Sequence, residues 1–228
     1  MILMRQLLLL LPLVAVAADP TAKLKLAFSE DFEGAALDTT KWVMEGNAQA
    51  ASLKGGKLVL AIIDRPDGWQ GTAISTRDKF TQAYGYFEAS IRFNAFRGHH
   101  GAFLVRNKMS TEPPAASLLF ECFGEDRVVP WARVADSKGL RELKPVKTDL
   151  VLRPNQVSKN FNTYGFGWTE KAYTWYFNGK AVHKLDKPEV SEPMHVYLGN
   201  WVGDSERKNL VPGNLPDNVE VDWVKVWK

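Results

Sequence analysis

The segment 115–123 is largely apolar and carries a single carboxylate, Glu121. Pro113 and Pro114 precede it and cannot donate to a β-ladder, which places them before a strand, and Gly124 follows it. Burial raises the pKa of a carboxyl group, and a carboxylic acid that stays protonated near neutrality can serve as a general acid. Glu121 is therefore a candidate catalytic acid. Considered alone, this segment favours the alternative, in which Glu121 reaches solvent at a groove or pairs with an arginine.

Aromatic side chains form a second group that could bind a ligand. The chain has 8 Trp, 6 Tyr and 12 Phe, and such rings stack on the apolar faces of sugars as well as filling protein cores. Trp69, Trp131 and Trp201 lie beside Gly, Pro or Asn and outside clean alternation. We predict that these three line a sugar-binding cleft. A place in the core or at the rim is the alternative for each.

The adjacent histidines His99 and His100 raise the question of a metal site. Neighbouring side chains on a strand point to opposite faces, so the pair is poorly arranged to share one ion. We expect His100 to lie in a loop or to contact sugar instead.

Strand signals recur along the whole chain, and convincing helical periodicity is absent. Residues 86–93 alternate between two faces, and Asn178-Gly179 joins residues 173–177 to 180–185 with a strong hairpin signal. The other expected strands are residues 24–32, 57–63, 101–106, 115–123 and 219–227, the last with strict alternation. Many short strands with Gly and Pro turns, and no helices between them, indicate an all-β sandwich or jelly roll.

Composition limits the classes of function. The formal charge is +3 with 24% charged residues, and the scattered Lys and Arg predict no nucleic-acid binding. No repeat or linker divides the sequence, so residues 19–228 are expected to form one domain. Cys122 is the single cysteine, which excludes an intrachain disulfide. A chain of this size can bury a sufficient core without one.

Residues 1–18 have the pattern of a secretory signal peptide. Arg5 supplies the positive charge, residues 7–16 form the apolar stretch, and Ala15-Val16-Ala17 or Val16-Ala17-Ala18 offers a cleavage site. The apolar stretch is too short to span a membrane. We therefore expect a secreted or periplasmic protein with no membrane span.

The motifs of this chain resemble those of glycoside hydrolase family 16, the laminarinase and lichenase group. The resemblance covers nearly all of residues 19–228. It is carried by residues 28–34 with 37–42, residues 84–92 (Tyr-Gly-Tyr-Phe-Glu-Ala-Ser-Ile-Arg), residues 161–164 with Trp168, residues 175–180 and residues 221–227. It implies a concanavalin A-like jelly roll of two antiparallel sheets, with a carbohydrate cleft across the concave face.

In that family the catalytic strand reads Glu-x-Asp-x-x-Glu, or Glu-x-Asp-x-Glu where a β-bulge is absent. The first Glu is the nucleophile, the Asp assists it and the last Glu, aligned here with Glu121, is the acid/base. The first two positions are Ala116 and Leu118 in the bulged frame, or Ser117 and Leu119 in the unbulged frame. A one-residue bulge changes which side chains face the cleft, so both frames stay open here. Neither supplies a second carboxylate.

Two further features bear on catalysis. His100 and Leu104 stand where the family commonly has two tryptophans, so sugar contacts differ as well. Retaining glycosidases need two carboxyl groups about 5–5.5 Å apart, and inverting ones about 6.5–9.5 Å. The relocated bases to consider are Glu88, Glu125, Asp126, Asp204 and Glu206. For Glu125 and Asp126, the alternative is a solvated turn after the strand.

The sequence thus predicts a protein that recognises a polysaccharide or oligosaccharide on a family 16 scaffold, with weak or no catalysis. One alternative is an active glycosidase of a β-glucan or galactan that uses Glu121 with a relocated carboxylate. A jelly roll that binds another partner is a third, lower-ranked class. We expect a monomer with no cofactor. The resemblance allows a structural Ca²⁺ between Asp222 and residues 30–33, as in some relatives.

Overall fold

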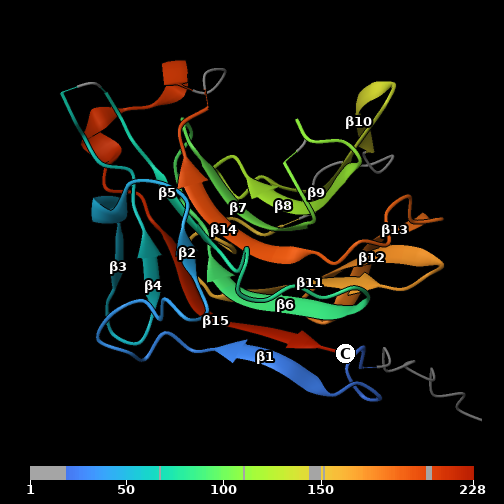
Figure 1. The fold of residues 1–228 in the computed structure, drawn as a ribbon. Coiled ribbons are helices and arrows are strands. Elements are labelled where there is room, and N and C mark those ends of the chain that lie inside the picture. Colours follow the sequence, from blue (N-terminus) through green and yellow to red (C-terminus); the bar gives the residue numbers. More distant parts are fainter. Residues whose placement is uncertain (1–18, 67, 110, 144–149, 151, 204–206) are drawn as a thin grey trace, which may run out of the picture.

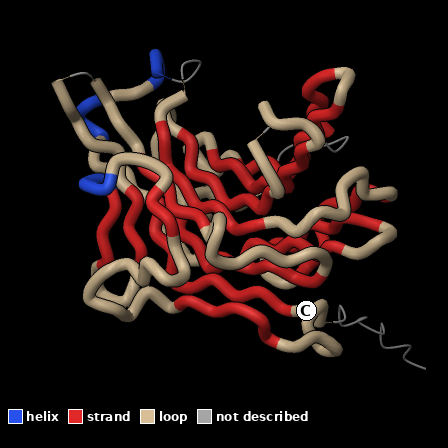
Figure 2. Tube along the Cα trace, viewed as in Figure 1, coloured by secondary structure: helices blue, strands red, loops and turns tan. Residues whose placement is uncertain are grey.

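The computed structural model describes residues 19–66, 68–109, 111–143, 150, 152–203 and 207–228. In these residues, fifteen strands form two antiparallel sheets, with three short 3₁₀ helices at Ala48–Ala50, Arg207–Asn209 and Pro212–Asn214. Figure 2 shows that strands, joined by loops, are the main regular secondary structure of the described chain. The predicted all-β, two-sheet sandwich is confirmed. The predicted signal peptide, residues 1–18, lies outside the described residues.

We call the two sheets sheet I and sheet II. Sheet I runs in the order β13 (Lys180–Asp186), β12 (Ala172–Phe177), β11 (Asn162–Trp168), β6 (Gly85–Arg92), β15 (Val219–Trp227), β4 (Leu58–Leu60) and β3 (Ala51–Leu53), and β1 (Leu26–Glu30) also pairs with β15. Sheet II runs in the order β10 (Gly139–Leu143), β9 (Val128–Asp136), β8 (Ala115–Cys122), β7 (His100–Arg106), β14 (His195–Trp201), β5 (Thr72–Ser75) and β2 (Val43–Met44). Figure 1 shows β1 beside β15, which brings the two ends of the described chain together.

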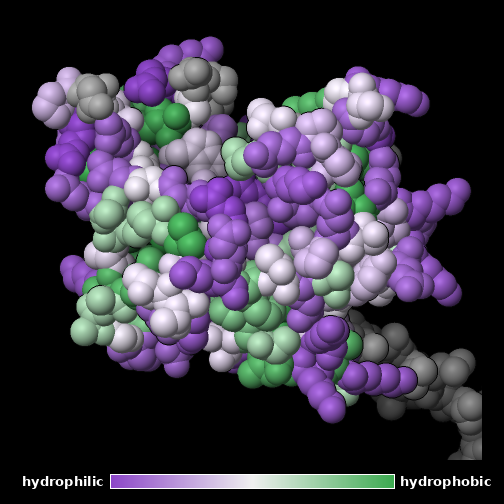
Figure 3. All heavy atoms as spheres, viewed as in Figure 1, coloured by the Kyte–Doolittle hydropathy of each residue, from purple (hydrophilic) through white to green (hydrophobic). Residues whose placement is uncertain are grey.

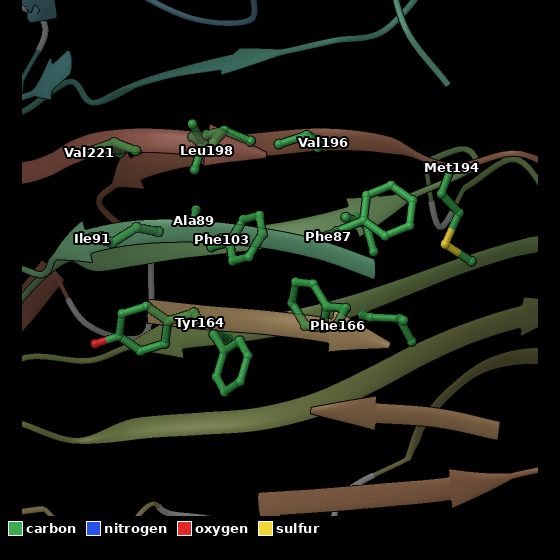
Figure 4. Packing of buried hydrophobic residues seen from close by; sticks show 14 of the residues in the cluster. Phe87, Ala89, Ile91, Phe103, Tyr164, Phe166, Met194, Val196, Leu198 and Val221 are labelled. Carbon is green, nitrogen blue, oxygen red and sulfur yellow. The ribbon is translucent and has the colours of Figure 1, made fainter. Parts of the chain in front are cut away.

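The core lies between the sheets and follows from the period of two along each strand. On β6 the side chains of Phe87, Ala89 and Ile91 point inward, as the sequence predicts. They meet Phe103 of β7 and Leu198 of β14 from sheet II, as Figure 4 shows. In the view of Figure 3, polar residues cover much of the surface and apolar residues appear in smaller patches.

The last strand differs from the expected strict alternation. Its pairing with β6 shifts register between Val221 and Trp223. A β-bulge adds one residue to a strand and so reverses the faces of the residues beyond it. As a result Val221 and Val224, three residues apart, both join the core.

The predicted hairpin is confirmed. Asn178 and Gly179 connect β12 to β13 with φ values of 48° and 72°. Both central residues of a type I′ turn need positive φ, which Asn and Gly tolerate best. The strands that were not predicted from the sequence include β5, β9 and β14, which all belong to sheet II.

Candidate functional site

Strand β8, which carries Glu121, lies within sheet II between β7 and β9. Its pairing is regular along its length on both sides, with Glu121 opposite Ala102 of β7 and Val129 of β9. A regular strand keeps a strict alternation of faces. The inward set is Ala116, Leu118, Phe120 and Cys122, which all belong to the core between the sheets.

The other face of β8 carries Ser117, Leu119 and Glu121. This is the outer face of sheet II, the face turned away from the core between the sheets. The strand therefore follows the unbulged frame, in which Ser117 and Leu119 occupy the first two motif positions. The bulged frame is wrong for this strand, because Ala116 and Leu118 are 2% and 1% exposed inside the core. Neither a hydroxyl group nor an isobutyl group can replace the family's two carboxylates there.

A second apolar cluster covers the outer face of sheet II around Glu121. Its buried members are Ala102, Leu104, Leu119, Val129 and Trp131, and the partly buried residues packed against them are Phe123, Tyr197 and Trp201. Glu121 itself is 3% exposed. The carboxyl group is thus placed among apolar side chains supplied by β7, β8 and β9.

Two of the predicted sugar contacts, Trp201 and His100, lie together at one end of this face. They are directly opposite in the pairing of β14 with β7, and their ring centroids are 6.0 Å apart. His100 also meets Phe123 edge to face at 4.5 Å. Phe123 in turn lines a cavity of about 780 Å³ whose other lining residues belong to the loops at 97, 124–127, 150 and 152–155. Among the described residues, Glu121, His100 and Trp201 do not line this cavity, so it lies beside the aromatic group and not over it.

Trp131 lies on the same face, opposite Leu119 in the pairing of β8 with β9, and is 5% exposed. Trp69 differs, because it is half-buried in the loop before Gln70, outside the apolar cluster. That loop nevertheless approaches β14, since a Cβ on Gly71 would lie 2.0 Å from the carbonyl oxygen of Asn200. Trp131, Trp201 and His100 share the face of Glu121, and the loop that carries Trp69 approaches β14 through Gly71.

Four polar or aromatic residues on this face were not predicted from the sequence: Arg106, Arg133, His195 and Tyr197. For His195 and Tyr197 the signal was the alternation within β14, where Val196 and Leu198 point inward and Tyr197 points outward. Arg106 and Arg133 lie on β7 and β9. The side chain of Arg106 stacks on Tyr197, with the guanidinium carbon 4.3 Å from the ring centroid.

Of the candidate relocated bases, the structure describes Glu88, which lies on sheet I, and Glu125 and Asp126, which lie in the turn after β8. Glu88 is on the outward face of sheet I, where it accepts a 2.9 Å hydrogen bond from Tyr86, and burial raises the pKa of its carboxyl group. Asp126 accepts hydrogen bonds from the main-chain N–H groups of Val157 and Ser158 and so anchors that loop. Glu125 is exposed in the turn. Asp204 and Glu206 lie outside the described residues.

The two possible metal sites have other structural roles. The imidazole of His99 lies between Asn200 (3.1 Å) and Asp217 (3.0 Å), and is 1% exposed. Glu30 accepts hydrogen bonds from the N–H groups of Asp31 and Phe32 and pairs with a lysine. Among the described residues, no cluster of three or more His, Cys, Asp or Glu could hold a metal ion. That part of the chain also contains no helix long and apolar enough to cross a membrane.

Two packed antiparallel sheets in this strand order define a jelly-roll sandwich. Residues 37–225 match the family described as Glycosyl hydrolases family 16, and the chain belongs to this family. The endo-1,3-1,4-beta-glycanase ExsH of Rhizobium meliloti is 26% identical over 159 residues, which are 68% of this chain and 32% of the relative. A beta-glucanase of Brevibacillus brevis is 37% identical over 72 residues, 30% of this chain and 28% of the relative. The matches thus span about a third of the length of these relatives.

Solved structures agree with the fold. The laminarinase of Flavobacterium sp. superposes with a TM-score of 0.74 at 18% identity, covering 90% of this chain and 100% of that chain. The laminarinase of Rhodothermus marinus gives a TM-score of 0.75 at 19% identity, covering 90% and 97%. At this level of identity the likeness establishes the jelly roll.

Proposed function

We propose that this protein is a secreted polysaccharide-binding member of family 16 with little or no glycosidase activity. The proposal rests on one observation, that Ser117 and Leu119 are the side chains that share the outer face of β8 with Glu121. Ser117 is a neutral alcohol and Leu119 is a hydrocarbon, so neither can form the glycosyl ester of a retaining mechanism through a carboxylate. The aromatic side chains of the same face support sugar binding.

The ligand class follows from the family. The similar proteins named above are an endo-1,3-1,4-beta-glycanase, a beta-glucanase and two laminarinases, and a chain of the same fold with aromatic rings on the face of Glu121 suits a β-glucan or galactan oligomer. Export is part of the proposal, on the pattern of residues 1–18. We propose that the protein acts as a monomer and needs no cofactor.

A second candidate function is retained hydrolysis. The observation that favours it is Glu121 itself, an acid kept among apolar side chains at 3% exposure. Glu45 is a carboxylate beside this face, through its 2.6 Å hydrogen bond from Ser75 of β5. Glu45 follows β2, which is four strands from β8, so the two main chains are roughly 19 Å apart at about 4.8 Å per strand, beyond the separation that an inverting pair needs. A working enzyme therefore requires a different base.

A binding titration together with a reducing-sugar assay tests the two candidates. The mature protein should give a saturable change in Trp fluorescence with laminarin, lichenan or agarose oligomers and release no reducing ends. Glu121→Gln tests the acid, and Glu88→Gln on the opposite sheet is the matched control. Hydrolysis that is lost in Glu121→Gln but kept in Glu88→Gln would establish the enzyme. Flat titrations across a broad glycan panel would remove the binding function.

A further inference from the structure

Three polar side chains form a row across sheet II at the position of the missing nucleophile. Ser117 of β8 is directly opposite Arg106 of β7 on one side and Arg133 of β9 on the other. Paired residues on adjacent strands point to the same face and lie about 4.5–5.5 Å apart at Cβ. The row therefore places a hydroxyl group between two arginines on the outer face of sheet II. We call it the Arg-Ser-Arg row.

Arg106 has no ion-pair partner among the described residues, and the carboxylates that act on it, Glu45 and Glu112, do so from beyond 4.0 Å. It is half-buried, and no described carboxylate lies within 4.0 Å of its guanidinium group. Its Nε donates to Nε2 of His195 at 3.3 Å. Burial and the nearby Arg106 lower the pKa of His195 to about 4, so this histidine is a neutral acceptor at pH 7. Burial also lowers the pKa of Arg106, as expected for a cation short of a counter-charge.

Arg133 on the other side is stacked in the same way but has a counter-charge, Glu142. Its guanidinium carbon lies 4.3 Å from the ring centroid of Trp131, as that of Arg106 does from Tyr197. Glu142 of β10 approaches its Nε at 3.7 Å. That Nε is buried and has no hydrogen-bond partner among the described residues. Stacking on a ring orients each guanidinium group and leaves its N–H edge available to a ligand.

We propose that the Arg-Ser-Arg row binds an acidic substituent of the polysaccharide, a carboxylate or a sulfate ester. This inference rests on the polysaccharide binding proposed above. The planar fork of arginine matches the paired oxygens of such groups, and Ser117 adds a hydroxyl donor between the two forks. A carboxylate nucleophile at position 117 would occupy and neutralise this site. Because position 117 carries a serine and not a carboxylate, the two arginines beside it can bind an anion from the ligand.

The row lies on the same strand as the remaining acid. Ser117 and Glu121 are four residues apart on β8, so their Cα atoms are roughly 13 Å apart at about 3.3 Å per residue, and Leu119 lies between them. Tyr197, which stacks on Arg106 and is half-buried, is placed to contact the sugar ring that carries the substituent, whereas Trp131 is buried and supports Arg133.

The test is a set of titrations of the mature protein with laminaritriose, trigalacturonic acid and a sulfated galactan oligomer. We expect the acidic oligomers to bind at least tenfold more tightly than laminaritriose at low salt, and to lose affinity as salt increases. Arg106→Gln or Arg133→Gln should each weaken acidic binding about ten- to hundredfold and leave laminaritriose binding unchanged. Arg92→Gln, on the outward face of sheet I, is the matched control and should change neither. A carboxylate ligand should lose affinity near pH 3, whereas a sulfate ester should not.

Two milder variants guard against misfolding. Arg106→Lys keeps the charge but loses the fork, and Ser117→Ala removes one hydroxyl group, so each should weaken acidic binding less than Arg106→Gln. Equal affinity for acidic and neutral oligomers would overturn the anion site, and so would an affinity for acidic oligomers that is unchanged in all four variants; in both cases polysaccharide binding would stand. If the protein bound none of the oligomers, the proposed function itself would be overturned.

Discussion

The indole Nε1 of Trp175 donates a 3.0 Å hydrogen bond to the main-chain carbonyl oxygen of Leu119. Trp175 belongs to β12 of sheet I and is fully buried, whereas Leu119 is two residues before Glu121 on β8 of sheet II. One hydrogen bond therefore crosses the core and ties the far sheet to the strand that carries the candidate site. Buried indole N–H groups usually find such an acceptor, since an unpaired donor is costly.

Trp175→Phe should lower the free energy of unfolding by about 1–3 kcal/mol, from the lost hydrogen bond and the space left by the smaller ring. Urea denaturation measures this as a shift of the midpoint at constant slope. Trp223→Phe is the control, because Trp223 is half-buried on sheet I and outside the core between the sheets. Equal effects of the two substitutions would show that the hydrogen bond across the core contributes nothing specific.

The unbulged register of β8 predicts which double substitution can restore glycosidase activity. Ser117→Glu with Leu119→Asp places two carboxylates on the face of Glu121, and some hydrolysis of laminarin or lichenan should appear. Adding Glu121→Gln should abolish it. General acid catalysis alone contributes roughly 10²–10⁴-fold, far below the 10⁶–10¹⁷-fold of most enzymes, so the unmodified protein should show negligible turnover.

The matched double variant is Ala116→Glu with Leu118→Asp. It buries two carboxyl groups in the core between the sheets, and the cost of several kcal/mol should prevent folding. Circular dichroism and soluble yield check this. A folded protein from this pair, or activity restored by it alone, would contradict the unbulged frame.

Sugar binding should depend on the rings that share the face of Glu121. Trp131→Ala and Trp201→Ala should each weaken binding by about 1–3 kcal/mol, the usual cost of removing a buried aromatic contact at an interface. Trp69→Ala should have a smaller effect, because Trp69 is outside the apolar cluster. Isothermal titration calorimetry with the tightest-binding oligomer measures these losses, with Trp223→Ala as control. If Trp223→Ala reduced affinity as much as the others, the ligand would bind elsewhere.

His195 should make stability depend on pH. Its pKa is lowered from 6.5 to about 4, chiefly by burial and then by Arg106 and Arg77, against the opposing effect of Glu45 and Asp78. Between pH 6.5 and 4 the unfolded chain binds a proton that the folded chain does not. Stability therefore falls as the pH falls through this window, by at most about 1.4 kcal/mol per pH unit from this group. Urea midpoints at several pH values should show a shallower slope in His195→Gln, and an unchanged slope would assign the dependence to other groups.

Export can be tested directly. N-terminal sequencing of protein from the periplasm or culture medium should find a chain that begins near Ala18 or Asp19. Replacing Ala15 and Ala17 with bulky residues should slow the cleavage, whereas replacing Thr21, which lies beyond the cleavage site, should not. An intact Met1 on the exported protein would contradict the predicted signal peptide.

The sequence alone determined the all-β class, because period-two alternation in residues 86–93 and the Asn178-Gly179 turn are local signals. It also determined that Glu121 has no acidic partner in its own strand motif, whichever frame applies. Both conclusions depend only on which residues are present and on short spacings, so they needed no knowledge of neighbouring strands.

The tertiary structure decided which face each residue of β8 occupies. Both faces of that strand are buried, so its apolar residues give no contrast from which the frame can be inferred. Only pairing with β7 and β9 places Ser117 and Leu119 beside Glu121. The same pairing brings Arg106 and Arg133 to either side of Ser117, although they come from separate strands. Register between strands is a nonlocal property set by packing, and for that reason the Arg-Ser-Arg row was invisible in the sequence.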